Sequence, residues 1–270
     1  MRKFMIADMH THSESSHDSV AGIEDMYEAE SERGTCIFAV TDHFDTASFS
    51  DYDCFSPIKA AHEEVLRLNK DGKRILLGIE ISEGFWYPDV SKQAIEMLDY
   101  DVIIGSVHLV RYKDLSYAYS KIDFSILSVD TVAEYVDAYF DDVLTMIDTV
   151  DFDVLAHLTN PLKYISGKYK IELDLTRYEE KIAKILQRIV EKGIALELNT
   201  SGEFPDIFIP SLSILKSYYG MGGRLLTLGS DAHVTANASR NFDRAICEIK
   251  KIGFDSIYYY ENRKAVKIEI

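Results

Sequence analysis

Residues 4–13 read Phe4-Met5-Ile6-Ala7-Asp8-Met9-His10-Thr11-His12-Ser13, a short apolar run followed by polar side chains at alternate positions. The apolar run is typical of a buried strand. Side chains two residues apart point to the same face of an extended segment, so Asp8, His10 and His12 are predicted to share one face. Two imidazoles on one face form half of a site for zinc, manganese or iron. For this stretch alone, an exposed loop with two unconnected histidines is the alternative, since His-x-His is common.

Six more apolar runs of strand length follow along the chain. They cover residues 36–40, 75–79, 102–105, 154–156, 194–198 and 225–229. Amphipathic segments between and after them predict helices at about residues 23–33, 57–70, 91–99, 130–149, 176–192, 211–219 and 241–252. Residues 256–260 and 265–268 predict short strands outside this repeat. Seven βα units without a Pro/Gly/Ser-rich linker predict one α/β domain over residues 1–270, with a closed or nearly closed parallel barrel.

The ends of the predicted strands carry the side chains that could do chemistry. In barrels of this kind the carboxyl ends of the strands form the active site. Seven of the eight histidines lie on or just after such ends, and only His62, within a predicted helix, lies elsewhere. A buried structural histidine explains a single case but not seven on one rim. The sequence therefore predicts a metal site at the carboxyl ends of the strands.

Composition excludes several classes of function. The formal net charge is −16, which repels a nucleic-acid backbone. Cys36, Cys54 and Cys247 are too far apart for a disulfide framework or a Cys-x-x-Cys metal site. No apolar run reaches membrane-spanning length, and no signal-peptide pattern follows Met1. We therefore expect a cytoplasmic protein that binds neither nucleic acid nor membranes; the sequence sets no oligomeric state.

In their order along the chain, these strand-end motifs resemble those of the polymerase and histidinol phosphatase (PHP) superfamily of metal-dependent phosphoesterases. The resemblance spans the whole chain and rests on residues 8–13 with His17, and on residues 41–43, 78–80, 105–108, 156–157 and 229–233. Within the superfamily the chain is most similar to the monofunctional histidinol-phosphate phosphatases. It shares their length, the His17-Asp18-Ser19 run and residues 197–202. The resemblance implies a distorted (β/α)7 TIM-like barrel with the metal centre at the C-terminal strand ends.

The resemblance also implies a set of ligands for two or three divalent ions, which could be zinc, manganese or iron. The first metal would be held by His10, His12, Glu80 and Asp231. The second would share Glu80 and add His108 and His157, and the third would use His17, His43 and His233.

Two acidic residues beside the implied ligands are predicted to support them. Asp42 would orient His43 or pass a proton to the departing alkoxide, and Asp8 would hold a ligand imidazole.

Three further residues are candidates for contact with substrate. Lys163 stands near the place where the group carries a basic residue, and Arg240 follows the seventh strand closely; for both, a surface cation is the alternative. Asn199 ends the sixth strand, where it could meet substrate. Residues 111–127, rich in tyrosine, form either part of the pocket or a surface insertion.

The implied reaction is hydrolysis of L-histidinol phosphate to L-histidinol and phosphate in histidine biosynthesis. A hydroxide that bridges the first two metals would attack phosphorus in line. The first alternative is another small phosphomonoester, such as a nucleotide, a sugar phosphate or a phosphotyrosine. The second is a remnant that keeps the fold without chemistry, against which the complete ligand set argues.

Overall fold

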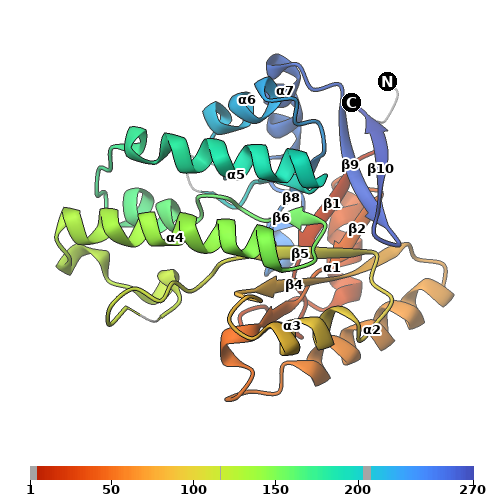
Figure 1. Ribbon diagram of the computed structural model, residues 1–270. Helices are drawn as coiled ribbons and strands as arrows, with labels where there is room; N and C mark the ends of the chain where they lie inside the picture. The colour runs from red at the N-terminus through yellow and green to blue at the C-terminus, as the bar shows by residue number, and fades with distance from the viewer. Residues whose placement is uncertain (1–4, 116, 203–207) are drawn as a thin grey trace.

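Seven parallel strands form the centre of the molecule in a computed structural model that describes residues 5–115, 117–202 and 208–270 (Figure 1). They pair in the order in which they occur along the chain: β1 (Ala7–Thr11), β2 (Ile37–Val40), β4 (Ile75–Ser82), β5 (Val102–Ser106), β6 (Val154–Leu155), β7 (Ala195–Asn199) and β8 (Leu226–Gly229). Every one of their residues is buried, as parallel strands covered by helices require. The predicted strands are confirmed, although Phe4 lies outside the described residues.

The two edge strands of this sheet come together just beyond their carboxyl ends. The backbone N–H of Asp231 donates to the carbonyl of His10 over 2.8 Å, and the N–H of His12 donates to the carbonyl of Ala232 over 3.0 Å. The pairing register shifts within β1 between Asp8 and Thr11, and β6 has only two residues. The sheet is therefore a nearly closed, distorted (β/α)7 barrel, which confirms the predicted fold class.

Helices connect the strands: α1 (Ile23–Glu32), α2 (Phe55–Lys70), α3 (Pro88–Ile95), α4 (Val129–Thr149), α5 (Glu179–Lys192), α6 (Leu212–Gly220) and α7 (Phe242–Ile252). In α5, Ile182, Ile185, Leu186 and Ile189 are buried, the spacing of one helix face. That helix ends at Gly193, whose φ of 71° suits a left-handed cap.

Two details differ from the predicted elements. Helix α3 begins at Pro88 rather than at residue 91, because proline fits the first turn, where its missing N–H costs nothing. A short extra strand, β3 (His43–Asp45), pairs with β4 beyond the end of β2, so that His43 lies beside Glu80.

The C-terminal hairpin closes the amino-terminal end of the barrel. Strands β9 (Ser256–Glu261) and β10 (Lys264–Glu269) pair antiparallel, and β9 lies against β8 and β1 (Figure 1). Arg263 in their turn binds Asp151 and Asp153, which precede β6, with N···O distances of 2.8 and 3.1 Å. This end is therefore fixed, and the opposite end is left for the site.

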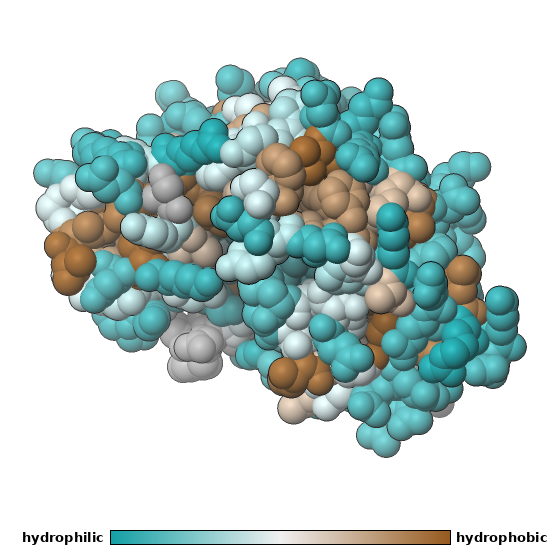
Figure 2. Space-filling model, turned by 90° about the horizontal axis from the view of Figure 1, so that it is seen from below, coloured by the Kyte–Doolittle hydropathy of each residue, from teal (hydrophilic) through white to brown (hydrophobic). Residues whose placement is uncertain are grey.

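The surface agrees with the acidic composition. On the face in Figure 2 most residues are hydrophilic, and hydrophobic ones form scattered patches. Within the described residues, none of the helices combines the length and apolar character that a membrane span requires. The three cysteines are free.

Candidate metal centre

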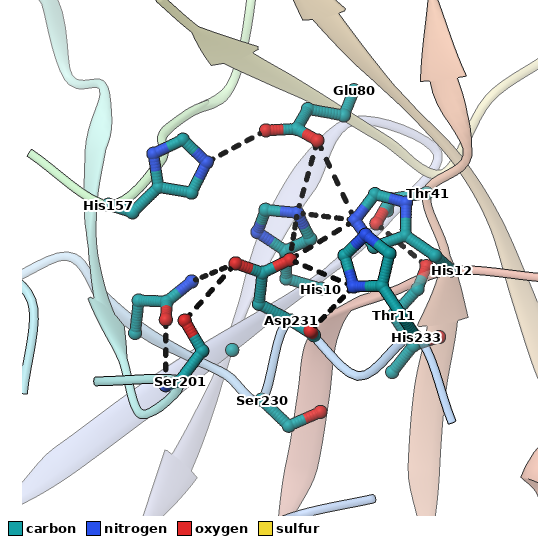
Figure 3. Close-up of polar contacts among 12 residues, drawn as sticks. His10, Thr11, His12, Thr41, Glu80, His157, Ser201, Ser230, Asp231 and His233 are labelled. Atoms are coloured by element: carbon teal, nitrogen blue, oxygen red, sulfur yellow. Dashed lines mark hydrogen bonds and ion pairs between the residues drawn. The ribbon is translucent and has the colours of Figure 1, made fainter. Parts of the chain in front are cut away.

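Four of the predicted ligands meet where β1, β4 and β8 end (Figure 3). The Nε2 atoms of His10 and His12 lie 3.0 Å apart. Glu80 Oε2 lies 3.3 and 3.6 Å from these two nitrogens, and Asp231 Oδ1 lies 3.7 and 3.3 Å from them. Ligand atoms bonded tetrahedrally to zinc at about 2.0–2.1 Å stand roughly 3.3–3.4 Å apart. The four side chains are thus spaced as ligands of one ion.

The second oxygen of Glu80 faces a second group of this kind. Glu80 Oε1 lies 3.0 Å from His157 Nε2 and 3.3 Å from His108 Nε2, and the two nitrogens are 3.4 Å apart. His157 reaches this position with a φ of 25°, which is rare for a residue with a side chain. Glu80 therefore stands between two candidate sites, as a bridging carboxylate would.

A third triangle includes a residue that was not among the predicted ligands. The Nε2 atoms of His43 and His233 lie 3.4 Å apart, and Asp18 Oδ1 lies 3.5 and 3.3 Å from them. The side chain of His17, predicted for this position, is 61% exposed, and its Nδ1 lies 3.6 Å from Asp45 Oδ2. The structure thus places Asp18 beside the other two ligands, while the ring centroid of His17 lies 5.5 Å from that of His43.

Hydrogen bonds at Nδ1 orient three of these imidazoles and leave Nε2 free to bind a cation. His10 Nδ1 donates to Glu197 Oε1 over 2.7 Å, and His12 Nδ1 lies 3.1 Å from Ser16 Oγ. His233 Nδ1 lies 2.9 Å from the carbonyl of Asp231. Such partners set the tautomer of metal-binding histidines.

Asp42 and Asp8 support the site, but neither contacts the ring of a ligand. Asp42 accepts hydrogen bonds from the hydroxyls of Ser13 and Ser16 at 2.6 and 2.7 Å, and Ser16 then contacts His12. Asp8 accepts the backbone N–H groups of His10 and Ser230 at 3.2 and 3.0 Å. Asp42 therefore orients a ligand through a serine, while Asp8 fixes the backbone where β1 meets the end of β8.

The carboxylates of the centre attract positive charge. Burial acts to lower the pKa of His108, but Glu80 and Asp45 outweigh it and raise that pKa to about 10. Burial is likewise outweighed at His10, whose pKa Glu197 and Glu80 raise well above the ordinary value. Burial acts to raise the pKa of Glu80, yet His10 and His108 hold it well below its usual range. The carboxylates therefore favour positive charge at His10 and His108, which a proton or a divalent cation can supply.

Two buried polar atoms at the centre lack hydrogen-bond partners in the part of the chain that the structure describes, as expected if a metal ion binds there. Glu80 Oε2 and His43 Nδ1 are buried and 2.8 Å apart, but neither makes a hydrogen bond of acceptable geometry within the described residues. A buried polar group left without a partner costs about 1–3 kcal/mol. Coordination of the carboxylate by a cation would remove that cost, so the donor set suits the divalent ions that the sequence predicts.

A cavity of about 540 Å³ opens beside these side chains. Its lining includes Lys163, whose Nζ lies 3.3 Å from Ser201 Oγ; Ser201 in turn contacts Asp231 Oδ2 at 3.3 Å. Residues 118–121 form another part of the wall. The tyrosine-rich segment thus contributes to the pocket and is not only a surface insertion.

The other two candidates for contact with substrate are engaged elsewhere. Arg240 donates to the carbonyl of Gly202 over 3.3 Å and is not among the residues that line the cavity. The amide nitrogen of Asn199 lies 3.2 Å from Glu197 Oε2 and 3.3 Å from Asp231 Oδ2. Asn199 therefore holds Asp231 in place.

Sequence reasoning missed three acidic residues at the centre. Asp18 follows His17 directly, and the family resemblance predicts the histidine as the ligand in its place. Asp45 is two residues after His43 and shares its face of β3; its Oδ1 lies 3.5 Å from His108 Nδ1. Glu197 lies within an apolar strand run, and a carboxylate buried there needs a partner. Its position in the run was therefore a signal of a functional or positioning role.

Comparisons with known proteins agree with this geometry. The family model described as "PHP domain" matches residues 8–201. A protein of Thermotoga maritima named "Probable histidinol-phosphatase" is 29% identical, with 97% of this chain and 99% of the relative covered. One of the same name from Clostridium acetobutylicum is 27% identical, with 93% and 97% covered.

A crystal structure has the same fold. The histidinol phosphate phosphatase of Lactococcus lactis, complexed with zinc, L-histidinol and phosphate, superposes with a TM-score of 0.75. It is 22% identical, and 97% of this chain and 99% of that one are covered. Because the family model covers well over half of its residues, the chain belongs to the PHP domain family.

Proposed function

We propose that the chain is a metal-dependent phosphatase that hydrolyses L-histidinol phosphate to L-histidinol and phosphate, a step of histidine biosynthesis. The observation that carries the proposal is the set of three ligand groups around Glu80, in which imidazole nitrogens and carboxylate oxygens from different strand ends converge within 3.0–3.7 Å of one another. The names of the near full-length relatives supply the substrate. So does the Lactococcus lactis enzyme, complexed with L-histidinol and phosphate.

The ligand groups define which ions and which residues we propose. Zinc, manganese or iron would be held at the first site by the predicted set of His10, His12, Glu80 and Asp231, and at the second by Glu80, His108 and His157. For the third site we propose His43, His233 and Asp18. Bound divalent ions would supply Lewis-acid stabilisation of the phosphoryl oxygens and a water nucleophile of lowered pKa.

The protein's own side chains bind and orient the substrate. Lys163 lines the cavity beside Asp231, where its ammonium can pair with a phosphoryl oxygen as a point charge. Asp45, which is not among the proposed ligands, also lines the cavity, and its carboxylate suits the cationic amine of an amino alcohol. Arg240 and Asn199 act from behind this wall, through Gly202 and Asp231.

The whole chain is proposed to act as one catalytic domain in the cytoplasm. One cluster of buried apolar side chains extends from Ala7 to Ile268, which supports a single folding unit. Three free cysteines, of which Cys36 and Cys247 are exposed, suit a reducing compartment.

Growth of a bacterial strain that lacks histidinol-phosphate phosphatase tests the proposal. We expect the gene for this chain to restore growth without histidine, and the Glu80→Gln variant, expressed to the same level, to fail because it loses the bridging carboxylate. An Arg224→Gln variant is a matched surface control, since Arg224 contacts only backbone carbonyls and a tyrosine ring among the described residues. Wild-type chain that is folded and metal-loaded in the cells but restores no growth would contradict the substrate.

A further inference from the structure

Glu197 is a buried carboxylate behind the metal centre that the proposed reaction does not use. It lies in β7 and is 1% exposed. Its Oε1 accepts the Nδ1–H of His10 over 2.7 Å. Its Oε2 accepts the backbone N–H of His157 over 2.7 Å and the amide N–H of Asn199 over 3.2 Å. Both oxygens are therefore fully engaged, and every partner is a donor.

Two of these partners belong to different candidate metal sites. His10 faces Glu80 Oε2 in the first group, and His157 faces Glu80 Oε1 in the second. The hydrogen bond to His10 keeps the proton on Nδ1 and directs the Nε2 lone pair towards the first site. The hydrogen bond to His157 holds a backbone with a φ of 25°, a conformation that surrounding contacts must maintain.

The fold leaves room for this carboxylate at one point in particular. A Cβ added at Gly229 would lie 2.0 Å from Glu197 Oε1 and 2.8 Å from the Cβ of His10. No larger residue at position 229 is compatible with the contact between Glu197 and His10. The absence of a side chain at the end of β8 is thus coupled to the orientation of a ligand on β1.

We propose that Glu197 is a positioning residue that prepares the first and second metal sites together, by fixing the tautomer of His10 and the backbone of His157. The inference rests on the metal centre of the proposed function and extends it to a residue outside the ligand set. Loss of the carboxylate should weaken metal binding at both sites, even though every ligand is retained.

Glu197→Gln tests the proposal because glutamine has one acceptor oxygen where glutamate has two. If that oxygen faces His157 and Asn199, the new NH2 group faces His10 Nδ1 and favours the tautomer that cannot bind metal at Nε2. The opposite orientation would place the NH2 group against the donors of both His157 and Asn199, so we expect the first orientation. We expect the zinc affinity of the folded variant, measured by competition with a chelator, to fall about 10- to 100-fold.

Two further measurements separate positioning from a merely structural role. In protein labelled with 15N-histidine, the hydrogen-bonded Nδ1–H resonance of His10 should be present in the wild type and lost in Glu197→Gln. Gly229→Ala, which keeps every ligand and Glu197 itself, should lower zinc affinity in the same direction. Asp101→Asn is the matched control: both of its carboxylate oxygens are also engaged, by two backbone N–H groups at 2.9 and 3.0 Å, but at the opposite end of the barrel. Its zinc affinity should be unchanged.

The proposal is overturned if Glu197→Gln binds zinc within twofold of the wild type and keeps the Nδ1–H resonance. If Glu197→Gln does not fold, Gly229→Ala decides by its zinc affinity, and a value within twofold of the wild type overturns the proposal. A wild-type chain that takes up no zinc would instead refute the proposed function, so that the two failures are distinct.

Discussion

Replacement of Asp18 by asparagine is predicted to empty the third metal site, whereas the same replacement of the adjacent His17 is not. Asp18 Oδ1 lies within 3.5 Å of the Nε2 atoms of His43 and His233, close to the roughly 3.3–3.4 Å expected between ligands of one zinc ion. His17 is 61% exposed, and its Nδ1 forms an ion pair with Asp45 at 3.6 Å. The pair of variants therefore compares two neighbouring residues of which only one is placed as a ligand.

The size of the effect follows from these positions. Loss of a partner outside the ligand set already costs roughly 10- to 100-fold in metal affinity. Removal of an anionic ligand should cost about 100-fold or more, roughly 2.7 kcal/mol. An exposed ion pair such as that of His17 is worth about 0–1 kcal/mol, so His17→Asn should change the affinity by less than about fivefold.

The assay is metal content per chain after equilibration at a series of buffered free-zinc concentrations. Asp18→Asn should show one binding step displaced to higher free zinc by two decades, with the other steps unchanged. His17→Asn should follow the wild type. Displacement of that step in His17→Asn, with Asp18→Asn unaffected, would refute the placement of Asp18 as ligand.

Three further predictions concern the phosphate contact, the protons of the centre and the closed end of the barrel. In steady-state assays Lys163→Gln should lower kcat/KM about 10- to 100-fold, because a hydrogen bond to a charged group is worth roughly 1.5–3 kcal/mol. The control Arg240→Gln, whose side chain lies outside the cavity, should change kcat/KM less than about threefold. Metal uptake at pH 7 should release protons, because the pKa values of His10 and His108 are raised and that of His108 reaches about 10. Metal affinity should therefore rise with pH up to about 10. Calorimetry in buffers of different ionisation enthalpy measures the protons released, and no release would mean that the imidazoles were already neutral. Arg263→Gln should reduce the free energy of unfolding by only about 1–2 kcal/mol, because solvent screens a partly exposed ion pair. The catalytic rate per metal-loaded enzyme should stay the same. A change in that rate with unaltered stability in urea would contradict the independence of the hairpin end of the barrel from the metal-centre end.

The sequence predicted the strands and most of the rim because both leave local signals. Apolar runs that end in histidine, aspartate or glutamate mark buried parallel strands and the residues just beyond them, and the structure brings eight of the nine predicted ligands together. Alternation within the first strand correctly placed His10 and His12 on one face.

The remaining features depend on contacts between distant segments. The choice between His17 and Asp18 follows from the path of the loop after β1, which brings Ser19 onto the backbone of His233. Asp42 accepts hydrogen bonds from Ser13 and Ser16, and not from the adjacent histidine, because the loop after β1 brings these serines next to the end of β2. No spacing in the sequence reveals either arrangement.

The roles of the basic residues were the least predictable. Lys163 and Arg240 have similar positions relative to their strands, yet the cavity includes the first and not the second. Arg240 is drawn to the carbonyl of Gly202, on a different βα unit. A cation near a strand end is therefore only a candidate for contact with substrate until the neighbouring loop is known.

The most direct measurement is kcat/KM for a panel of phosphomonoesters on protein whose metal content has been determined in the same sample. The panel contains L-histidinol phosphate, p-nitrophenyl phosphate, a nucleoside monophosphate and a phosphotyrosine peptide. We predict a preference for L-histidinol phosphate of a hundredfold or more, roughly 2.7 kcal/mol of discrimination. A flat ranking, or a preference for another ester by metal-loaded enzyme, would contradict the assigned substrate.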